Sequence, residues 1–288
     1  MCCTELYCNV DDFWKSFKQE WDKHLIDSRK SKRRPEPDLT IPEMMSIVIL
    51  FHQSGYRTFK HFYHYVCNHL RKEFPKLISY SRFVYLMKNI FVPLFAYLLH
   101  IRGAVTGIAF IDSTSIAVCH NKRITRNKVF KGLAKRGKTT SGWFYGFKLH
   151  LIINDKGEIL SFQITPGNTS DVSMVEVLSK GIFGKLFGDK GYISSKLGKS
   201  LLDQGLELFT SVRANMKQKL MSWRDKILLR KRSIIETVND QLKNISQVEH
   251  TRHRSVCNFL VNMLGGLAAY CHQPKKPSLR AVNGDLIC

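Results

Sequence analysis

Apolar and polar residues alternate over a long stretch in the middle of the chain. Every odd position in Trp143–Ile153 is apolar, which is the period-two pattern of a β-strand. The turn residues Asn154–Gly157 follow, and apolar positions alternate again over Leu160–Thr165. We therefore predict an antiparallel hairpin. The apolar run Ile108–Asp112, which ends at its acidic residue, predicts a third strand next to it.

The pattern changes after this hairpin to one in which helices and strands alternate. A helix is expected from about Ser173, and it leads to an apolar strand that ends at Asp189. A second helix over Ser195–Gln204 leads to a strand over Leu206–Val212. A meander followed by β-α-β-α is the order expected of a ribonuclease-H-like α/β fold, a mixed sheet flanked by helices.

The first hundred residues have helical patterns and helix-start signals instead. A helix is expected to open at Asp11 or Asp12, and Thr40 caps a second helix with a proline in its first turn. Thr58 and Ser79 (or Ser81) are expected to cap two more. Three short helices with tight connections form either a helix-turn-helix-like module or an ordinary small bundle. The charged, proline-containing segment 29–37 predicts a linker or arm.

The net charge adds information about partners and compartment. The chain has 45 Lys and Arg against 23 Asp and Glu, a formal charge of +22. Such an excess favours a polyanionic partner, with nucleic acid first and an anionic membrane surface second. The apolar stretches Phe83–Leu99 and Val256–Cys271 are short and interrupted, so we expect no membrane span. Without a signal-peptide pattern or a Cys-x-x-Cys pair, we expect reduced thiols in a cytoplasmic protein.

Three acidic residues in separate segments are the strongest candidates for chemistry. Asp112 and Asp189 each end an apolar strand, and Glu236 lies inside a predicted helix. Two strand ends and one helix can meet at one edge of a sheet. Carboxylate oxygens are the ligands that Mg²⁺ prefers, and a metal pair held this way can drive in-line displacement at a phosphodiester.

The helix around Glu236 has two distinct faces. At 100° per residue, Arg232 and Lys243 fall within about 40° of Glu236. The apolar residues Ile234, Val238, Leu242 and Ile245 cluster on the opposite side. An isolated surface helix would show the same pattern, so the stripe alone does not establish a site.

Two segments concentrate positive charge. The segment Lys122–Lys138 contains eight Lys or Arg and no Asp or Glu. It is either a solvated loop or a DNA contact through phosphate neutralisation, and we expect the latter. The segment Arg213–Arg232 carries eight more cations around Trp223. We expect Trp223 to pack rather than to stack on a displaced base. The predicted contacts in the first segment are Lys122, Arg123, Arg126, Lys128, Lys131, Lys135, Arg136 and Lys138.

Taken together, these motifs resemble the DDE transposases of bacterial insertion sequences. Ile111–Thr114 is similar to the first-Asp strand of that family, and Gly146–His150 with Thr165–Asp171 to its hairpin and following turn. Gly188–Tyr192 is similar to its second-Asp motif. Arg232, Glu236 and Lys243 have the spacing of its third motif, although Leu229 stands where the pattern has Tyr.

The resemblance implies metal-dependent cleavage at element ends and strand transfer to target DNA. It implies that Asp112, Asp189 and Glu236 hold two Mg²⁺ ions, or Mn²⁺ in their place. Arg232 and Lys243 would contact DNA phosphates or orient Glu236. The implied partners are the terminal inverted repeats and target DNA, bound by a homodimer associated with the nucleoid.

The predicted organisation has three parts. Residues 1–103 form a helical DNA-binding region, residues 104–250 a ribonuclease-H-like catalytic domain, and residues 251–288 a C-terminal helix and tail. Two other functions stay open: a nuclease or resolvase of the same fold that does not join DNA, and a non-catalytic DNA-binding protein derived from a transposase. The three acidic residues weigh against the second of these.

Overall fold

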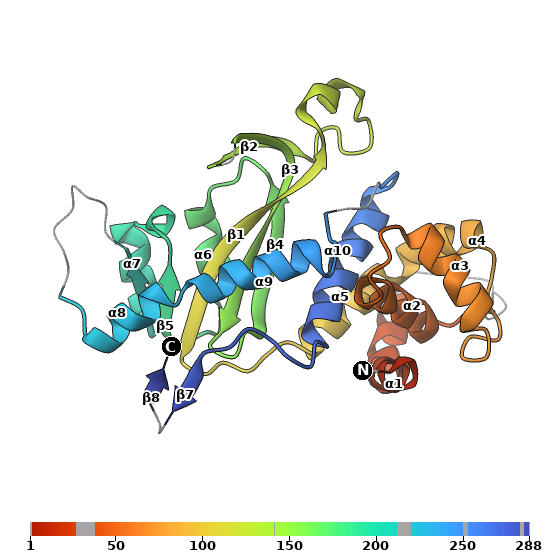
Figure 1. Cartoon of the computed structure of the whole chain (residues 1–288), viewed down its shortest axis with the longest axis horizontal. Coiled ribbons are helices and arrows are strands. Elements are labelled where there is room, and N and C mark those ends of the chain that lie inside the picture. The colour runs from red at the N-terminus through yellow and green to blue at the C-terminus, as the bar shows by residue number, and fades with distance from the viewer. Residues whose placement is uncertain are drawn as a thin grey trace. The chain divides into compact units, whose positions relative to one another are not determined.

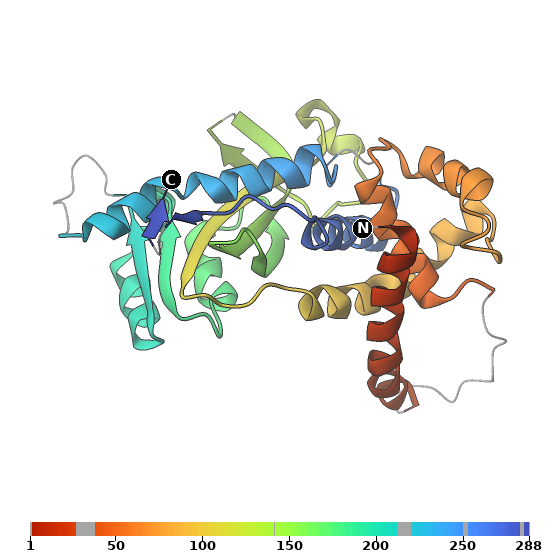
Figure 2. The same cartoon turned by 60° about the horizontal axis from the view of Figure 1, so that its bottom comes forward.

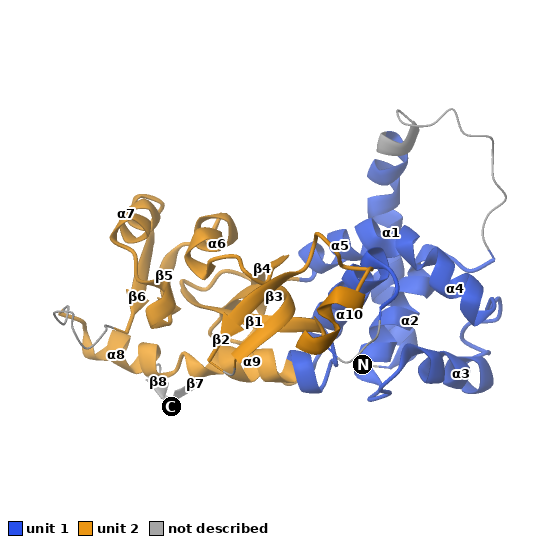
Figure 3. Ribbon diagram, turned by 90° about the horizontal axis from the view of Figure 1, so that it is seen from above, with its two compact units in different colours: residues 1–101, 242–274 blue, residues 102–241, 275–288 orange. Residues whose placement is uncertain are grey.

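A computed structural model describes residues 2–26, 38–140, 142–211, 220–249, 253–282 and 285–287. It separates into unit 1, residues 1–101 with 242–274, and unit 2, residues 102–241 with 275–288 (Figure 3). The predicted linker 29–37 lies outside the described residues.

Unit 1 is helical, and side-chain caps define where several of its helices begin. Thr40 caps α2: its hydroxyl accepts a hydrogen bond from the backbone N–H of Glu43, whose carboxylate accepts the N–H of Thr40 at 2.7 Å. Thr58 and Ser79 cap α3 and α4 as predicted. The elements are α1 (Cys3–Ile26), α2 (Ile41–Gln53), α3 (Phe59–His69), α4 (Tyr80–Leu86), η1 (Met87–Ile90), α5 (Phe91–His100) and α10 (Val256–Cys271).

The first helix begins earlier than predicted. It starts at Cys3 rather than Asp11, because Leu6, Val10 and Phe13 continue one buried face at helical spacing. The stretch Tyr80–His100 is long and apolar enough to span a membrane by length and composition. In the structure it forms three successive helices, and its inward side chains are part of the unit 1 core.

Helix α10 comes from the C-terminal part of the chain but packs inside unit 1, against α2 and α5. A Cβ added at Gly265 would overlap Val48 and crowd His52, so glycine allows this close approach. The predicted boundaries instead placed this helix in a separate C-terminal segment. The break between the units, after residue 101, falls next to the predicted boundary after residue 103.

Unit 2 is built on a mixed sheet of six strands (Figure 1). The strand order is β2-β3-β1-β5-β6, and β4 pairs with β3. The pairs β1–β3, β2–β3 and β3–β4 are antiparallel, whereas β5 is parallel to both β1 and β6. The strands are β1 (Ile108–Cys119), β2 (Lys135–Thr139), β3 (Gly142–Asn154), β4 (Ile159–Pro166), β5 (Gly184–Gly188) and β6 (Leu206–Thr210).

Helices cover both faces of this sheet (Figures 2 and 3). On one face α6 and α7 pack over a cluster that includes Ala109, Ile111 and Leu186. The face with α8 and α9 contains Phe110 and Phe187, whose ring centroids are 5.6 Å apart. The other elements of the unit are η2 (Asn121–Arg126), α6 (Asp171–Leu178), η3 (Lys190–Tyr192), α7 (Ser195–Asp203), α8 (Trp223–Arg230), α9 (Ser233–Asn244), β7 (Arg280–Val282) and β8 (Asp285–Ile287).

The predicted fold class is confirmed: a mixed α/β sheet flanked by helices follows an all-α N-terminal region. The predicted hairpin is the pair β3–β4, and the strand predicted to end at Asp112 continues to Cys119 as β1. The prediction missed η2 and β2, which lie in or overlap the basic segment Lys122–Lys138. Strand β2 was missed because its side chains are mostly charged and lack the apolar alternation of a strand, while its backbone pairs at the edge of the sheet.

Burial of His52 in unit 1 makes stability depend on pH. Burial lowers the pKa of His52 from 6.5 to about 4, and its Nδ1 donates a hydrogen bond to the Ser246 carbonyl. The unfolded chain takes up a proton near the ordinary value, whereas the folded protein does so only at lower pH. The stability contributed by neutral His52 is therefore present above about pH 6.5 and is lost as the pH falls toward 4.

We expect His52→Asn to destabilise the protein less in acid than at neutral pH. Between about pH 7 and pH 5, the loss in free energy of unfolding caused by the substitution should shrink by about 2 kcal/mol. Urea denaturation at both pH values measures it. His64→Asn, at an exposed position on α3, is the control. If His52→Asn lowers the free energy of unfolding equally at the two pH values, the pKa of His52 is not lowered by burial.

Candidate acidic site

The first candidate carboxylate lies within strand β1, on the side of the sheet that faces α9. Asp112 follows Ile111, which packs toward α6, so its side chain points to the opposite face. There the amide of Asn239 in α9 donates a hydrogen bond to Asp112 Oδ2 at 3.0 Å. The carboxylate is largely buried at the point where the helix passes over the strand.

The second candidate, Asp189, follows strand β5 directly. The parallel pairing joins Phe110 to Phe187, so Asp112 and Asp189 each lie two residues beyond a paired position. Neighbouring strands are about 4.8 Å apart, and residues two apart share a face. The pairing stops at Phe110 with Phe187 and β5 ends at Gly188, so adjacent positions for Asp112 and Asp189 on one face are what we expect if this register continues for two more residues.

The third candidate, Glu236, lies on α9, and its carboxylate is held by Arg232. Arg232 Nη2 donates to Glu236 Oε1 at 2.8 Å, four residues apart on the helix surface. The Glu236 side chain is 55% exposed, whereas Ile234 and Val238 are buried as predicted. Ile245 was predicted to pack but is 51% exposed, because α9 ends at Asn244.

Sequence reasoning missed Asn239. It lies one turn after Glu236, is only 6% exposed and binds Asp112. Its other amide atom, Oδ1, is buried with no hydrogen-bond partner in the described part of the chain. A polar residue among the apolar positions of α9 is the only signal the sequence offers, and such a residue can equally satisfy a backbone group.

The charge of Asp112 is disfavoured by its surroundings. Burial raises the pKa of Asp112 from 3.8 to about 6. Hydrogen bonds from the Ser113 backbone and Asn239, together with the charge of Arg232, act in the opposite direction, and Glu236 adds to the rise. Positive charge close to this carboxylate would favour its ionised form.

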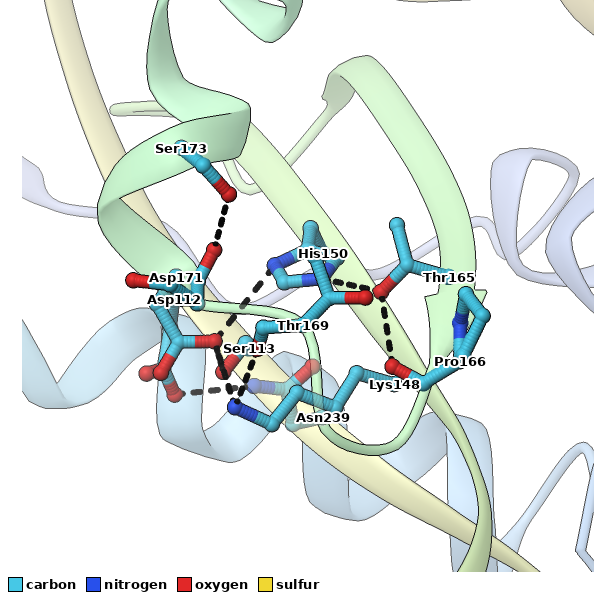
Figure 4. A network of polar contacts seen from close by, with 11 residues as sticks. Asp112, Ser113, Lys148, His150, Thr165, Pro166, Thr169, Asp171, Ser173 and Asn239 are labelled. Atoms are coloured by element: carbon cyan, nitrogen blue, oxygen red, sulfur yellow. Dashed lines mark hydrogen bonds and ion pairs between the residues drawn. The ribbon is translucent and has the colours of Figure 1, made fainter. Parts of the chain in front are cut away.

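A polar network lies beside Asp112 and centres on Asp171, the first residue of α6 (Figure 4). Asp171 Oδ1 accepts the Ser113 hydroxyl at 2.8 Å and Lys148 Nζ at 3.0 Å. His150 Nδ1 lies 3.7 Å from the same oxygen. Sequence reasoning placed Asp171 only in the turn after the hairpin and gave it no role.

Burial lowers the pKa of His150 to about 4, so this histidine is neutral near pH 7. Its Nε2 is 2.8 Å from the Thr165 hydroxyl, which belongs to the neighbouring strand β4. The contact therefore ties β3 to β4 beside the acidic residues.

The buried Tyr192 hydroxyl also lies close to the acidic residues. Burial raises its pKa, and the negative charges of Asp112, Asp171 and Asp189 raise it further. Among the described residues, no three His, Cys, Asp or Glu side chains form a group that could hold a metal ion. The convergence of Asp112, Asp189 and Glu236 stays a prediction.

All eight predicted DNA contacts in Lys122–Lys138 lie on η2, on β2 and on the segment between them, and all eight are exposed. Lys243, predicted to contact DNA or orient Glu236, lies 3.3 Å from Glu249 Oε2. In the second basic segment, residues 212–219 lie outside the described part of the chain. Trp223 opens α8 and is 63% exposed, so it is not a packing residue.

The contact between Asn239 and Asp112 can be tested by titration. A hydrogen bond to a carboxylate stabilises its charged form, so Asn239→Ala should raise the pKa of Asp112 above about 6 in metal-free protein. NMR titration of the Asp carboxyl carbons measures this. Thr237 is exposed on the same helix, so Thr237→Ala should leave the pKa of Asp112 unchanged. A pKa that Asn239→Ala does not move would show that the amide does not bind Asp112.

Comparison with known proteins identifies the family to which the chain belongs. Residues 102–256, more than half of the chain, match the family model described as a transposase DDE domain. Among solved structures, the chain is similar to the piggyBac transposase in a synaptic complex with hairpin DNA. The TM-score is 0.49 and the identity 11%, over 85% of this chain and 67% of that one. The Mos1 strand transfer complex is similar with a TM-score of 0.23 and an identity of 10%, over 86% of this chain and 82% of that one. No curated protein sequence matches the chain.

Proposed function

Because the chain belongs to the transposase DDE domain family, we propose that it cuts DNA at the ends of a bacterial insertion sequence and joins those ends to target DNA. The reaction is a metal-dependent displacement at phosphodiester bonds. Asp112, Asp189 and Glu236 are the proposed catalytic carboxylates.

The parallel pairing of β1 with β5 carries this proposal. It pairs Phe110 with Phe187, two residues before Asp112 and Asp189, which supports placing both carboxylates on the face of the sheet that α9 covers. The Asn239–Asp112 hydrogen bond then fixes α9, and with it Glu236, over the same edge. We therefore expect three carboxylates from distant segments to converge on one region.

A divalent cation fits the chemistry of these residues. They offer carboxylate oxygens alone, which are the preferred ligands of hard ions such as Mg²⁺ and Mn²⁺. The raised pKa of Asp112 reflects a buried negative charge that a cation would stabilise. When bound, a pair of such ions supplies activation of the attacking hydroxyl and stabilisation of the leaving oxygen.

Residues of the chain itself would position the reacting groups. Asn239 holds Asp112, and Arg232 holds one oxygen of Glu236, so both carboxylates have restricted orientations before DNA arrives. The cations of Lys122–Lys138 would contact DNA phosphates. Arg232 and Lys243 would add contacts when DNA replaces their present carboxylate partners.

The proposal extends to assembly and location. Joining a whole element requires that both of its ends be cut together, which a homodimer with one acidic site in each protomer would achieve. A charge of +22 favours association with DNA of the nucleoid in the cytoplasm.

Replacing one carboxylate separates chemistry from binding. Asp189→Asn preserves shape but removes a charged metal ligand, so Mg²⁺-dependent nicking should fall by about 100-fold or more. Affinity for the same inverted-repeat duplex should persist, because cations elsewhere carry it. The paired measurement is gel-shift affinity and nicking on one substrate.

The matched control is Asp203→Asn, which makes the same chemical change at the exposed end of α7. It should nick and join DNA like the wild type. If Asp189→Asn nicks at the wild-type rate, Asp189 is not a catalytic ligand. If the wild type nicks the duplex but forms no strand-transfer product, the protein is a nuclease rather than a transposase.

Neutralising the basic segment should weaken DNA binding without regard to sequence. Replacing Lys122, Arg126 and Lys131 by Gln should lower the slope of log affinity against log salt by about 0.9 for each phosphate that these side chains neutralise. Replacing Lys180, Lys196 and Lys199 by Gln removes the same number of charges on the face of the sheet that α6 and α7 cover, and should have a smaller effect. An unchanged slope would show that the segment is only solvated surface.

A further inference from the structure

The hairpin of β2 and β3 presents an aromatic ring beside two cations. Lys138 is paired with Trp143 across the two strands, and Arg136 with Tyr145. Residues two apart on a strand share a face, so Arg136, Lys138 and Trp143 lie on the same side of the hairpin. The Arg136 guanidinium carbon is 5.6 Å from the Trp143 ring centroid, and Lys138 Nζ is 5.8 Å from it.

The opposite side of the hairpin is packed, and Tyr145, on the same side as Trp143, is buried, so this side of β3 is exposed only at its start, at Trp143. Gly137 and Phe144 are buried. A Cβ at Gly137 would overlap the Gly167 carbonyl oxygen and the Phe144 ring, so the backbone rests directly on the turn after β4. Trp143 is 56% exposed although the next four residues of the strand, Phe144–Phe147, are buried. Its exposure is therefore a property of a rigid, packed hairpin.

Positive charge surrounds the ring. The Asn121 amide donates to the Trp143 carbonyl at 2.6 Å and ties η2 to the start of β3. Helix η2 contributes Lys122, Arg123 and Arg126, all exposed, and Lys122–Lys138 contains no acidic residue. This field would repel another positively charged surface such as a second copy of the chain. It favours a partner that combines negative charge with a flat apolar group.

We propose that Trp143 stacks on an unpaired base of DNA while Arg136 and Lys138 contact the phosphates on either side. An aromatic ring on a positively charged surface is the arrangement that binds single-stranded nucleic acid, because each base offers a π face and each phosphate a charge. A regular duplex hides its base faces, so stacking needs a frayed, bulged or single-stranded segment. The proposal rests on the proposed function for the choice of DNA, but not on the catalytic carboxylates.

The test compares single-stranded and duplex DNA. Trp143→Ala should weaken binding of a labelled oligothymidylate by roughly 5- to 100-fold, whereas Trp143→Phe should retain most of it. Affinity for a blunt duplex of equal length should change less than about twofold, because phosphate contacts dominate there. Fluorescence anisotropy at fixed salt measures both, and circular dichroism confirms that each variant is folded.

Phe183→Ala is the matched control, since Phe183 is an aromatic residue of unit 2 that is 57% exposed and lies outside the basic hairpin. It should bind both probes like the wild type. The proposal is overturned if Trp143→Ala binds the single strand like the wild type, or if it weakens both probes equally. These binding measurements do not depend on nicking. If the proposed function fails, the protein will not cleave DNA, but single-strand binding will still depend on Trp143.

Discussion

The parallel pairing of β1 with β5 is the interaction on which the proposed site depends. Its register, which joins Ala109 to Leu186 and Phe110 to Phe187, is held by apolar contacts on both faces of the sheet. A slip of one residue would turn Asp189 to the opposite face, away from Asp112. Gly184 starts β5 at φ +94°, where a Cβ would overlap the Gly107 carbonyl, so glycine permits this register.

Helix α9 reaches the same edge through polar contacts rather than through sequence proximity. Lys185 of β5 binds Asp225 of α8 at 2.6 Å, and Ser222 donates to the same carboxylate. Although burial acts to raise it, the pKa of Asp225 is lowered by these two contacts. This ion pair ties the start of the α8–α9 segment to the strand that precedes Asp189. Asn239 then ties α9 to β1, so both strands of the parallel pair help to place Glu236.

Local patterns in the sequence were sufficient for much of this arrangement. Period-two alternation identified β3 and β4, and apolar runs with an acidic end located Asp112 and Asp189. The features that were missed depend on pairing and packing partners that the local apolar pattern does not reveal. Strand β2 has no apolar alternation and exists because its backbone pairs with β3. The role of Asn239 depends on Asp112, which is far away in the sequence, and α10 joins unit 1 through residues far earlier in the chain.

The most direct test of the account is the position of a bound metal ion in the protein. Crystals grown with Mn²⁺, which can replace Mg²⁺ and scatters anomalously, would locate it without reference to activity. The account predicts anomalous density between the carboxylates of Asp112, Asp189 and Glu236. Mn²⁺ bound elsewhere, or held without one of these three side chains, would contradict it.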